Sequence, residues 1–144
     1  MTHQTLAERV EAILVARNPR GMQTLRAALE PGYTLRAARA LIAARNVIIG
    51  TGFPVANTFE TDGPLGSIAL YRALERCGST CHLACARPLA AALEGDFRVI
   101  ELEAFDARAG HEEAQRNLAR FAPDLVISIE RPGLAADGRY YNMR

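Results

Sequence analysis

Apolar residues at helical spacing dominate the first third of the chain. Three helices are expected there, because leucine, isoleucine, valine and alanine recur every third or fourth residue. The first ends at Asn18-Pro19, the second lies between Met22 and Pro31, and the third begins at Thr34, which can cap it. The pattern therefore predicts an N-terminal helical segment.

The spacing of apolar residues changes after residue 45. Four short runs rich in apolar and β-branched residues follow, at Asn46–Ile49, Thr80–Cys85, Phe97–Leu102 and Leu125–Ile129. Helical stripes separate them, one from Asp62 to Gly78 and one near residues 110–121. Strands that alternate with helices predict parallel pairing. We therefore expect a three-layer α/β fold, a mostly parallel sheet with helices on both faces, in which the first and last strands are buried neighbours.

Composition limits the partners of the chain. It has 144 residues, 49% of them hydrophobic, and a formal net charge of +1. Nucleic acid and anionic membranes favour basic patches, so neither is expected as a partner. The sequence shows no apolar run of about 18 residues and no secretory signal, and its three cysteines fit a reducing compartment. We expect a single α/β domain over residues 1–144, located in the cytoplasm.

The most unusual stretch is NVIIGTGFPVANTFETDGPLG, residues 46–66. Ligands of open parallel sheets bind beyond the carboxyl ends of the strands, where Gly50 and Gly52 allow close approach of the backbone. The helix start at Asp62-Gly63-Pro64 offers free N–H groups, but Glu60 and Asp62 add negative charge. A substrate with an amine and a carboxylate, or a bound cation, fits this mixture. The structural alternatives are a glycine turn and Asp62 as the helix N-cap.

A second polar loop, IERPGLAADGRYYNMR at residues 129–144, follows the last strand. Glu130 stands at the edge of the core and needs a partner, of which Arg131 is the nearest in sequence. The density of polar donors favours binding, although Asp137-Gly138 is also a common surface turn. If the first and last strands are neighbours, both loops meet at one crevice.

These stretches resemble a known family. IIGTGFPV, ETDGPLGSIALYRAL and IERPGLAADGRYYNMR are similar to the D-glutamate cyclase C-terminal domain family, as is NPRGM at 18–22, with Asn18 in place of the usual Asp. The resemblance implies a hydro-lyase that dehydrates D-glutamate to 5-oxo-D-proline without ATP, since the five-membered ring closes with high effective molarity. It also implies that residues 1–144 are the N-terminal part of a longer cyclase-like domain, completed by a second copy or a complementary C-terminal chain.

The chemistry of ring closure suggests roles for the polar residues. The candidate catalytic acids and bases are Glu60, Asp62, Glu130 and Asp137. Arg131 or Arg144 is expected to anchor the α-carboxylate. The other expected substrate-binding residues are Gly50, Thr51, Gly52, Phe53, Thr61, Gly63, Gly133, Tyr141 and Asn142.

Metal binding and functions other than ring closure are the alternatives to this interpretation. Four carboxylates at one crevice would also suit Mg²⁺ or Mn²⁺. Cys77, Cys81 and Cys85 are expected to pack rather than to bind zinc, because Gly78 breaks the helix that would bring them together. The alternative function is a non-catalytic module that binds an amino acid or a nucleotide. A dinucleotide enzyme is disfavoured, because the glycine loop lacks the G-x-G-x-x-G spacing.

Overall fold

The computed structural model describes residues 2–17, 21–55, 58–104, 106–131, 133, 135–139 and 141. The chain divides into two compact units, Met1–Ala43 and Ala44–Arg144. A single domain over residues 1–144 stays a prediction. Within the described ranges, no helix has the length and apolar character needed to cross a membrane.

The described residues of the first unit form three helices, as predicted: α1 (His3–Val15), α2 (Met22–Ala27) and α3 (Tyr33–Ala43). Glu11 of α1 is fully buried and accepts hydrogen bonds from the backbone N–H of Gly32 at 3.0 Å and of Thr34 at 2.9 Å. Burial alone would raise the pKa of Glu11, but these bonds and one from the Thr34 hydroxyl outweigh it and hold the pKa below its usual range. An ionised Glu11 therefore ties the start of α3 to α1. Residues 18–20 of the NPRGM motif lie outside the described ranges.

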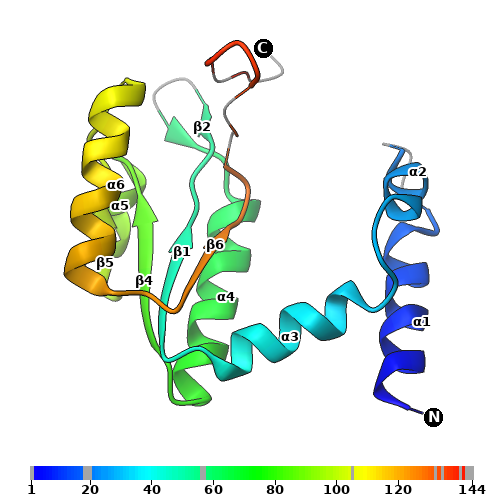
Figure 1. Cartoon of the computed structure of the whole chain (residues 1–144). Helices are drawn as coiled ribbons and strands as arrows, with labels where there is room; N and C mark the ends of the chain where they lie inside the picture. Colours follow the sequence, from blue (N-terminus) through cyan, green and yellow to red (C-terminus); the bar gives the residue numbers. More distant parts are fainter. Residues whose placement is uncertain are drawn as a thin grey trace. The chain divides into compact units, whose positions relative to one another are not determined.

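The second unit is built on a four-stranded sheet in the order β5-β4-β1-β6. The strands are β1 (Asn46–Gly50), β4 (Thr80–Cys85), β5 (Val99–Glu101) and β6 (Leu125–Ser128), and every pairing is parallel. The helices α4 (Asp62–Arg76) and α6 (Ala107–Phe121) lie on opposite sides of the sheet, and the short α5 (Leu89–Leu93) follows β4 (Figure 1). The predicted α/β fold is confirmed, as is the pairing of the first strand with the last.

The core of this unit lies on both faces of β1 and β4. The register pairs Val47 with Cys81 and Ile49 with Leu83, and all four side chains are buried on one face. On the other face, Phe121 of α6 packs against a cluster formed by Ile48, Ala84 and Ile100. Both central strands are thus buried on both faces, which explains why their sequences are continuous apolar runs.

The last strand differs from its prediction. We expected Leu125–Ile129 to be a buried strand, but β6 is an edge strand whose residues alternate in exposure, and Val126 is 57% exposed. This prediction was wrong because an apolar run does not reveal the order of strands in a sheet. Asp124 fixes the start of β6, since its carboxylate accepts from the backbone N–H groups of Arg45 and Asn46, both at 2.8 Å.

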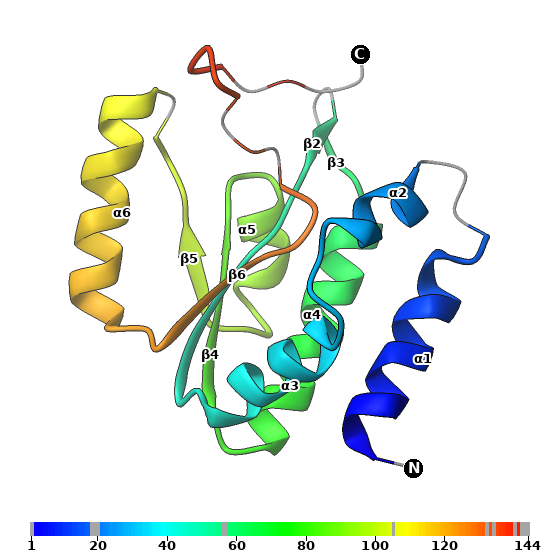
Figure 2. The ribbon, with the colours of Figure 1, turned by 45° about the vertical axis from the view of Figure 1, so that its right-hand side comes forward.

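The long connection after β1 contains a small hairpin. Strands β2 (Pro54–Val55) and β3 (Thr58–Phe59) pair antiparallel, and the N–H of Glu60 donates to the carbonyl of Phe53 at 3.0 Å. Figure 2 shows this hairpin and the segment after β6 at the same end of the sheet as the carboxyl ends of the parallel strands. Both polar loops of the sequence therefore reach the edge where ligands of such folds bind.

Candidate functional site

The loops after β1 and β6 meet at Thr51. The N–H of Thr51 donates to the carbonyl of Ala84 on β4 at 3.0 Å, and its carbonyl accepts from Nη1 of Arg131, also at 3.0 Å. The N–H of Ile129 donates to the carbonyl of Gly50 at 2.8 Å. The predicted meeting of the two loops is confirmed, and Thr51 is its central residue.

Two glycines make room for the charged residues that follow β6. A Cβ on Gly50 would lie 3.3 Å from Cδ of Arg131, and a Cβ on Gly63 would lie 2.5 Å from Cβ of Glu130. Glu130 has a φ of 50°, in the left-handed region that residues other than glycine rarely adopt. Glu130 therefore lies against the first turn of α4, while Arg131 passes over the end of β1.

The hydroxyl of Thr51 has no hydrogen-bond partner within the described part of the chain, although Thr51 is 0% exposed. Its Oγ1 lies 3.4 Å from the position that a Cβ on Gly63 would take, and the Cβ and Cγ of Glu130 surround the same point. Buried polar atoms in proteins are nearly always hydrogen-bonded, so an unpartnered one calls for an explanation, such as an ordered water, a bound ion or a functional role.

The start of α4 differs by one residue from its prediction. Asp62 was expected as a possible N-cap, but Thr61 holds that position, and Oδ1 of Asp62 instead accepts from the N–H of Gly63 at 3.2 Å. Thr61 already has a near-helical backbone, with φ −100° and ψ −23°, so the helix begins earlier. Both Asp62 and Glu60 are exposed. Pro64 lies in the first turn, as predicted.

Asp137 lies in an exposed turn and not against β1 or α4 in any described contact. Its carboxylate accepts from the hydroxyl of Tyr141 and from the N–H of Arg139 at 3.1 Å. The hydrogen bond from Tyr141 lowers the pKa of Asp137 and raises that of Tyr141. These contacts are those of the surface turn that we gave as the alternative. Gly133 is exposed, and Asn142 and Arg144 lie outside the described residues.

A cavity of about 600 Å³ opens at the carboxyl ends of the strands. Its wall is formed by Gly52 after β1, Thr58 and Phe59 of β3, residues 86–89 after β4, Leu102 and Ala104 after β5, the first turns of α6, and Arg131 after β6. This volume is in the range of small-molecule sites. Gly52 and Arg131 were predicted here, whereas none of the four candidate carboxylates is among the wall residues.

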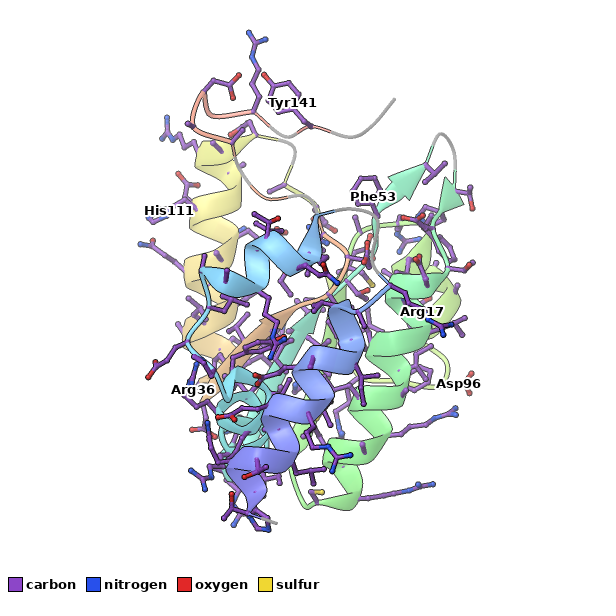
Figure 3. The ribbon with its side chains drawn as sticks, turned by 90° about the vertical axis from the view of Figure 1, so that its right-hand side faces the viewer. Arg17, Arg36, Phe53, Asp96, His111 and Tyr141 are labelled. Carbon is purple, nitrogen blue, oxygen red and sulfur yellow. The ribbon has the colours of Figure 1, made fainter. Side chains whose placement is uncertain are left out.

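Sequence reasoning missed the part of the wall that α6 supplies. Asp106, His111 and Glu113 line the cavity there. Figure 3 shows His111 with Phe53 and Tyr141 toward the end of the sheet that carries the carboxyl ends of the strands. The sequence predicted a helix near residues 110–121 and gave none of its residues a role in the site. The available signal was its position, since a helix that follows a parallel strand starts at the ligand-binding edge of the sheet.

Most charged groups of the cavity are already paired. Arg87 donates to both carboxylate oxygens of Glu101, at 2.5 and 3.0 Å, and the hydrogen bond from Arg87 lowers the pKa of Glu101. Asp106 caps α6, because its Oδ1 accepts from the N–H of Ala109 at 2.9 Å. Glu113 accepts from the N–H of Glu103 at 2.8 Å. Arg131, by contrast, has no salt-bridge partner in the part of the chain that the structure describes. Its charge is therefore available to a ligand.

The described ranges contain no group of three or more His, Cys, Asp or Glu side chains arranged to hold a metal ion. Binding of Mg²⁺ or Mn²⁺ stays a prediction. Cys81 and Cys85 are buried, and burial raises the pKa of each thiol to about 11, while Cys77 is exposed. The two buried thiols are thus protonated at neutral pH and pack as small apolar side chains.

Comparison with known proteins identifies the family of the chain. The family described as D-glutamate cyclase-like, C-terminal, matches residues 10–144. D-glutamate cyclase, mitochondrial, of Homo sapiens is 30% identical over 131 residues, and the match covers 76% of this chain and 21% of that protein. The chain thus spans about a fifth of the length of this curated relative. Because the family match includes nearly the whole chain and both loops of the site, the chain belongs to the D-glutamate cyclase-like, C-terminal family.

Proposed function

We propose that this protein is a D-glutamate cyclase-like lyase, which converts D-glutamate into 5-oxo-D-proline with loss of water. The observation that carries the proposal is Arg131, a cation without a salt-bridge partner in the described ranges, at the wall of a cavity beyond the carboxyl ends of the parallel strands. D-Glutamate has two carboxylates and one ammonium. A site with an unpaired arginine and a neighbouring glutamate complements those charges.

The reaction is an intramolecular amide formation. The ammonium loses a proton to a base, the amine nitrogen attacks the γ-carboxyl carbon and gives up a second proton, and the C–O bond breaks as one carboxyl oxygen takes up both protons and leaves as water. Holding the two ends of one molecule together gives the step its high effective molarity. The site therefore needs an anchor for the α-carboxylate, a base near the amine, and a donor near the γ-carboxyl oxygen.

Glu130 is the candidate base that its surroundings favour. It is adjacent to Arg131 and lies against Gly63, so it stands beside the anchor of the substrate. Asp62 accepts from the N–H of Gly63 and Asp137 is bonded to Tyr141, which ties both to local structure. Glu60 and Glu130 are both exposed, but Glu60 follows the hairpin, whereas Glu130 directly precedes Arg131.

The proposal extends to the setting of the reaction. D-Glutamate or a related amino acid is the partner, and the cytoplasm is the proposed location, which the three free thiols support. Mg²⁺ or Mn²⁺ as a cofactor would act through carboxylate ligands. Dialysis against EDTA, followed by assay with and without each ion, tests that part. Completion by a second copy or a complementary C-terminal chain stays a prediction.

The decisive experiment is incubation of the purified protein with D-glutamate or L-glutamate, followed by chiral chromatography. We expect 5-oxo-D-proline to form from D-glutamate. Calorimetric titration with D-glutamate in parallel separates the alternatives. Binding without conversion would favour the non-catalytic amino-acid-binding module, and neither binding nor conversion would reject both functions.

A further inference from the structure

We infer that Thr51, Glu130 and Arg131 form a subsite for the α-amino-carboxylate end of the substrate, with the Thr51 hydroxyl as a ligand of the amine. This inference rests on the proposed function and adds which end of the molecule binds where. Arg131 binds the α-carboxylate, Glu130 and Thr51 bind the ammonium, and the rest of the molecule enters the adjoining cavity.

The first argument is the unpartnered hydroxyl of Thr51. Threonine oxygen can donate one hydrogen bond and accept others, yet Oγ1 of Thr51 is buried and makes none to the described residues. Oγ1 lies 3.4 Å from the point that a Cβ on Gly63 would occupy, and the first two side-chain carbons of Glu130 lie 2.5 and 3.1 Å from the same point. A hydroxyl between a carboxylate-bearing side chain and an incoming ammonium can accept from the ammonium and donate to the carboxylate.

The second argument is the arrangement of charge around Thr51. Arg131 is bonded to its carbonyl oxygen, and Glu130 packs on the same glycine, Gly63, as its hydroxyl does. One Nη1 hydrogen of Arg131 is used by Thr51, which leaves other donors of the guanidinium for a carboxylate. A cation at the carbonyl of Thr51 and an acidic side chain on the glycine next to its hydroxyl match the two charges of an amino-acid zwitterion.

The third argument concerns the helix start beside the Thr51 hydroxyl. A helix N-terminus usually favours anions. In α4, however, the N–H of Gly63 is already bonded to Asp62, and Pro64 has no N–H. The hydroxyl side of Thr51 therefore suits an ammonium better than a second carboxylate.

The fourth argument is the cavity. Arg131 both contacts Thr51 and lines the cavity of about 600 Å³, so a ligand carboxylate on Arg131 is placed at the cavity wall. The carbon chain and γ-carboxyl of D-glutamate then have space beyond it. This orientation leaves the amine near Glu130, as its role of base requires.

The experiment compares two unreactive probes by calorimetric titration. D-Norvaline has the amine and the α-carboxylate without a γ-carboxyl group, whereas glutarate has two carboxylates and no amine. Thr51→Val removes the hydroxyl at nearly constant shape, and Thr51→Ser keeps it. We expect Thr51→Val to weaken binding of D-norvaline and D-glutamate about tenfold or more, the usual effect of losing a hydrogen bond to a charged group. Glutarate binding should be unchanged, and Thr51→Ser should restore the binding of both amines.

The thermal stability of Thr51→Val separates this role from a structural one. Removing an unpartnered buried hydroxyl should leave the melting temperature unchanged or raise it. Glu130→Gln is the second variant, to be used if Thr51→Val does not fold. It should weaken the binding of D-norvaline and leave the binding of glutarate unchanged.

The outcomes distinguish the inference from the proposed function. D-Norvaline binding that is unaffected in Thr51→Val or Glu130→Gln, an equal loss of glutarate binding, or no binding of D-norvaline to the unmodified protein would overturn the inference. If the unmodified protein forms no 5-oxoproline but binds D-norvaline in a Thr51-dependent way, the proposed cyclase fails and the subsite stands.

Discussion

Arg131 and Thr51, 80 positions apart in the sequence, are joined by a hydrogen bond of 3.0 Å from Nη1 to the backbone carbonyl oxygen. This bond connects the loop after β6 with the loop after β1. A carbonyl group holds the guanidinium without neutralising it. Arg131 is therefore positioned by the fold and keeps its full charge for a ligand.

The first prediction concerns Arg131. Arg131→Ala should lower kcat/KM for D-glutamate by about 10- to 100-fold, because hydrogen bonds to a charged group are lost. Arg131→Lys should restore only part of the rate, since lysine keeps the charge but lacks the planar fork. Arg76→Ala, an exposed change in the last turn of α4, is the control and should retain the rate. Equal rates for the Arg131 and Arg76 variants would contradict the anchor role.

The second prediction uses two glycines of one helix. Gly63→Ala would place a Cβ 2.5 Å from Cβ of Glu130, whereas a Cβ on Gly66 meets nothing within 4 Å. Gly63→Ala should destabilise the fold by about 1–3 kcal/mol, the usual range for overpacking, and should displace Glu130. Gly66→Ala should stabilise it by about 0.5–1 kcal/mol, since alanine is the better helix former. Urea unfolding of both variants measures the difference, and equal effects would show that Glu130 does not lie against Gly63.

The third prediction separates two carboxylates. Glu130→Gln should keep the fold and lower cyclisation by at least about 100-fold, as expected for the loss of a general base. Asp62→Asn should have little effect on the rate, because Asp62 is bonded only to the neighbouring N–H of Gly63 in the described contacts. Single-turnover assays and circular dichroism of both variants check this. Full activity of Glu130→Gln would show that Glu130 has only a structural role in the loop.

The sequence predicted the sheet well, because β1 and β4 are buried on both faces and carry the continuous apolar runs that such strands need. It also predicted that Gly50, Thr51, Gly63, Glu130 and Arg131 would belong together, since parallel strands end at one edge. It did not predict the exposure of Val126, because strand order depends on contacts between distant segments.

Two features of the site itself were also beyond sequence patterns. The unpartnered hydroxyl of Thr51 is a property of packing, and no local pattern distinguishes it from an ordinary buried threonine. The contribution of His111 and Glu113 to the cavity depends on where α6 packs, although both belong to a periodic helix. Side chains on helices that border a site are thus harder to predict than those in glycine-rich loops.

The fourth prediction concerns pH and the first unit. The pKa of Glu11 is held below its ordinary value of 4.5, so the stabilisation that this ionised group provides is present above about pH 4.5 and is lost as the pH falls through the lowered pKa. Glu11→Gln should lower the urea midpoint at pH 7 and reduce its dependence on pH below 4.5. Glu8→Gln, the same change at a half-buried glutamate of the same helix, is the control. An unchanged pH dependence in Glu11→Gln would show that Glu11 does not carry this stabilisation.

The edge position of β6 has a consequence for the site. Among the described strands, β6 pairs only with β1, and it leads directly to Glu130 and Arg131. Local opening of an edge element requires less free energy than unfolding of the whole unit. Amide hydrogens of β6 should therefore exchange with solvent faster than those of the central strands. A ligand held by Arg131 binds only the closed form, so its binding should slow that exchange in proportion to ligand concentration.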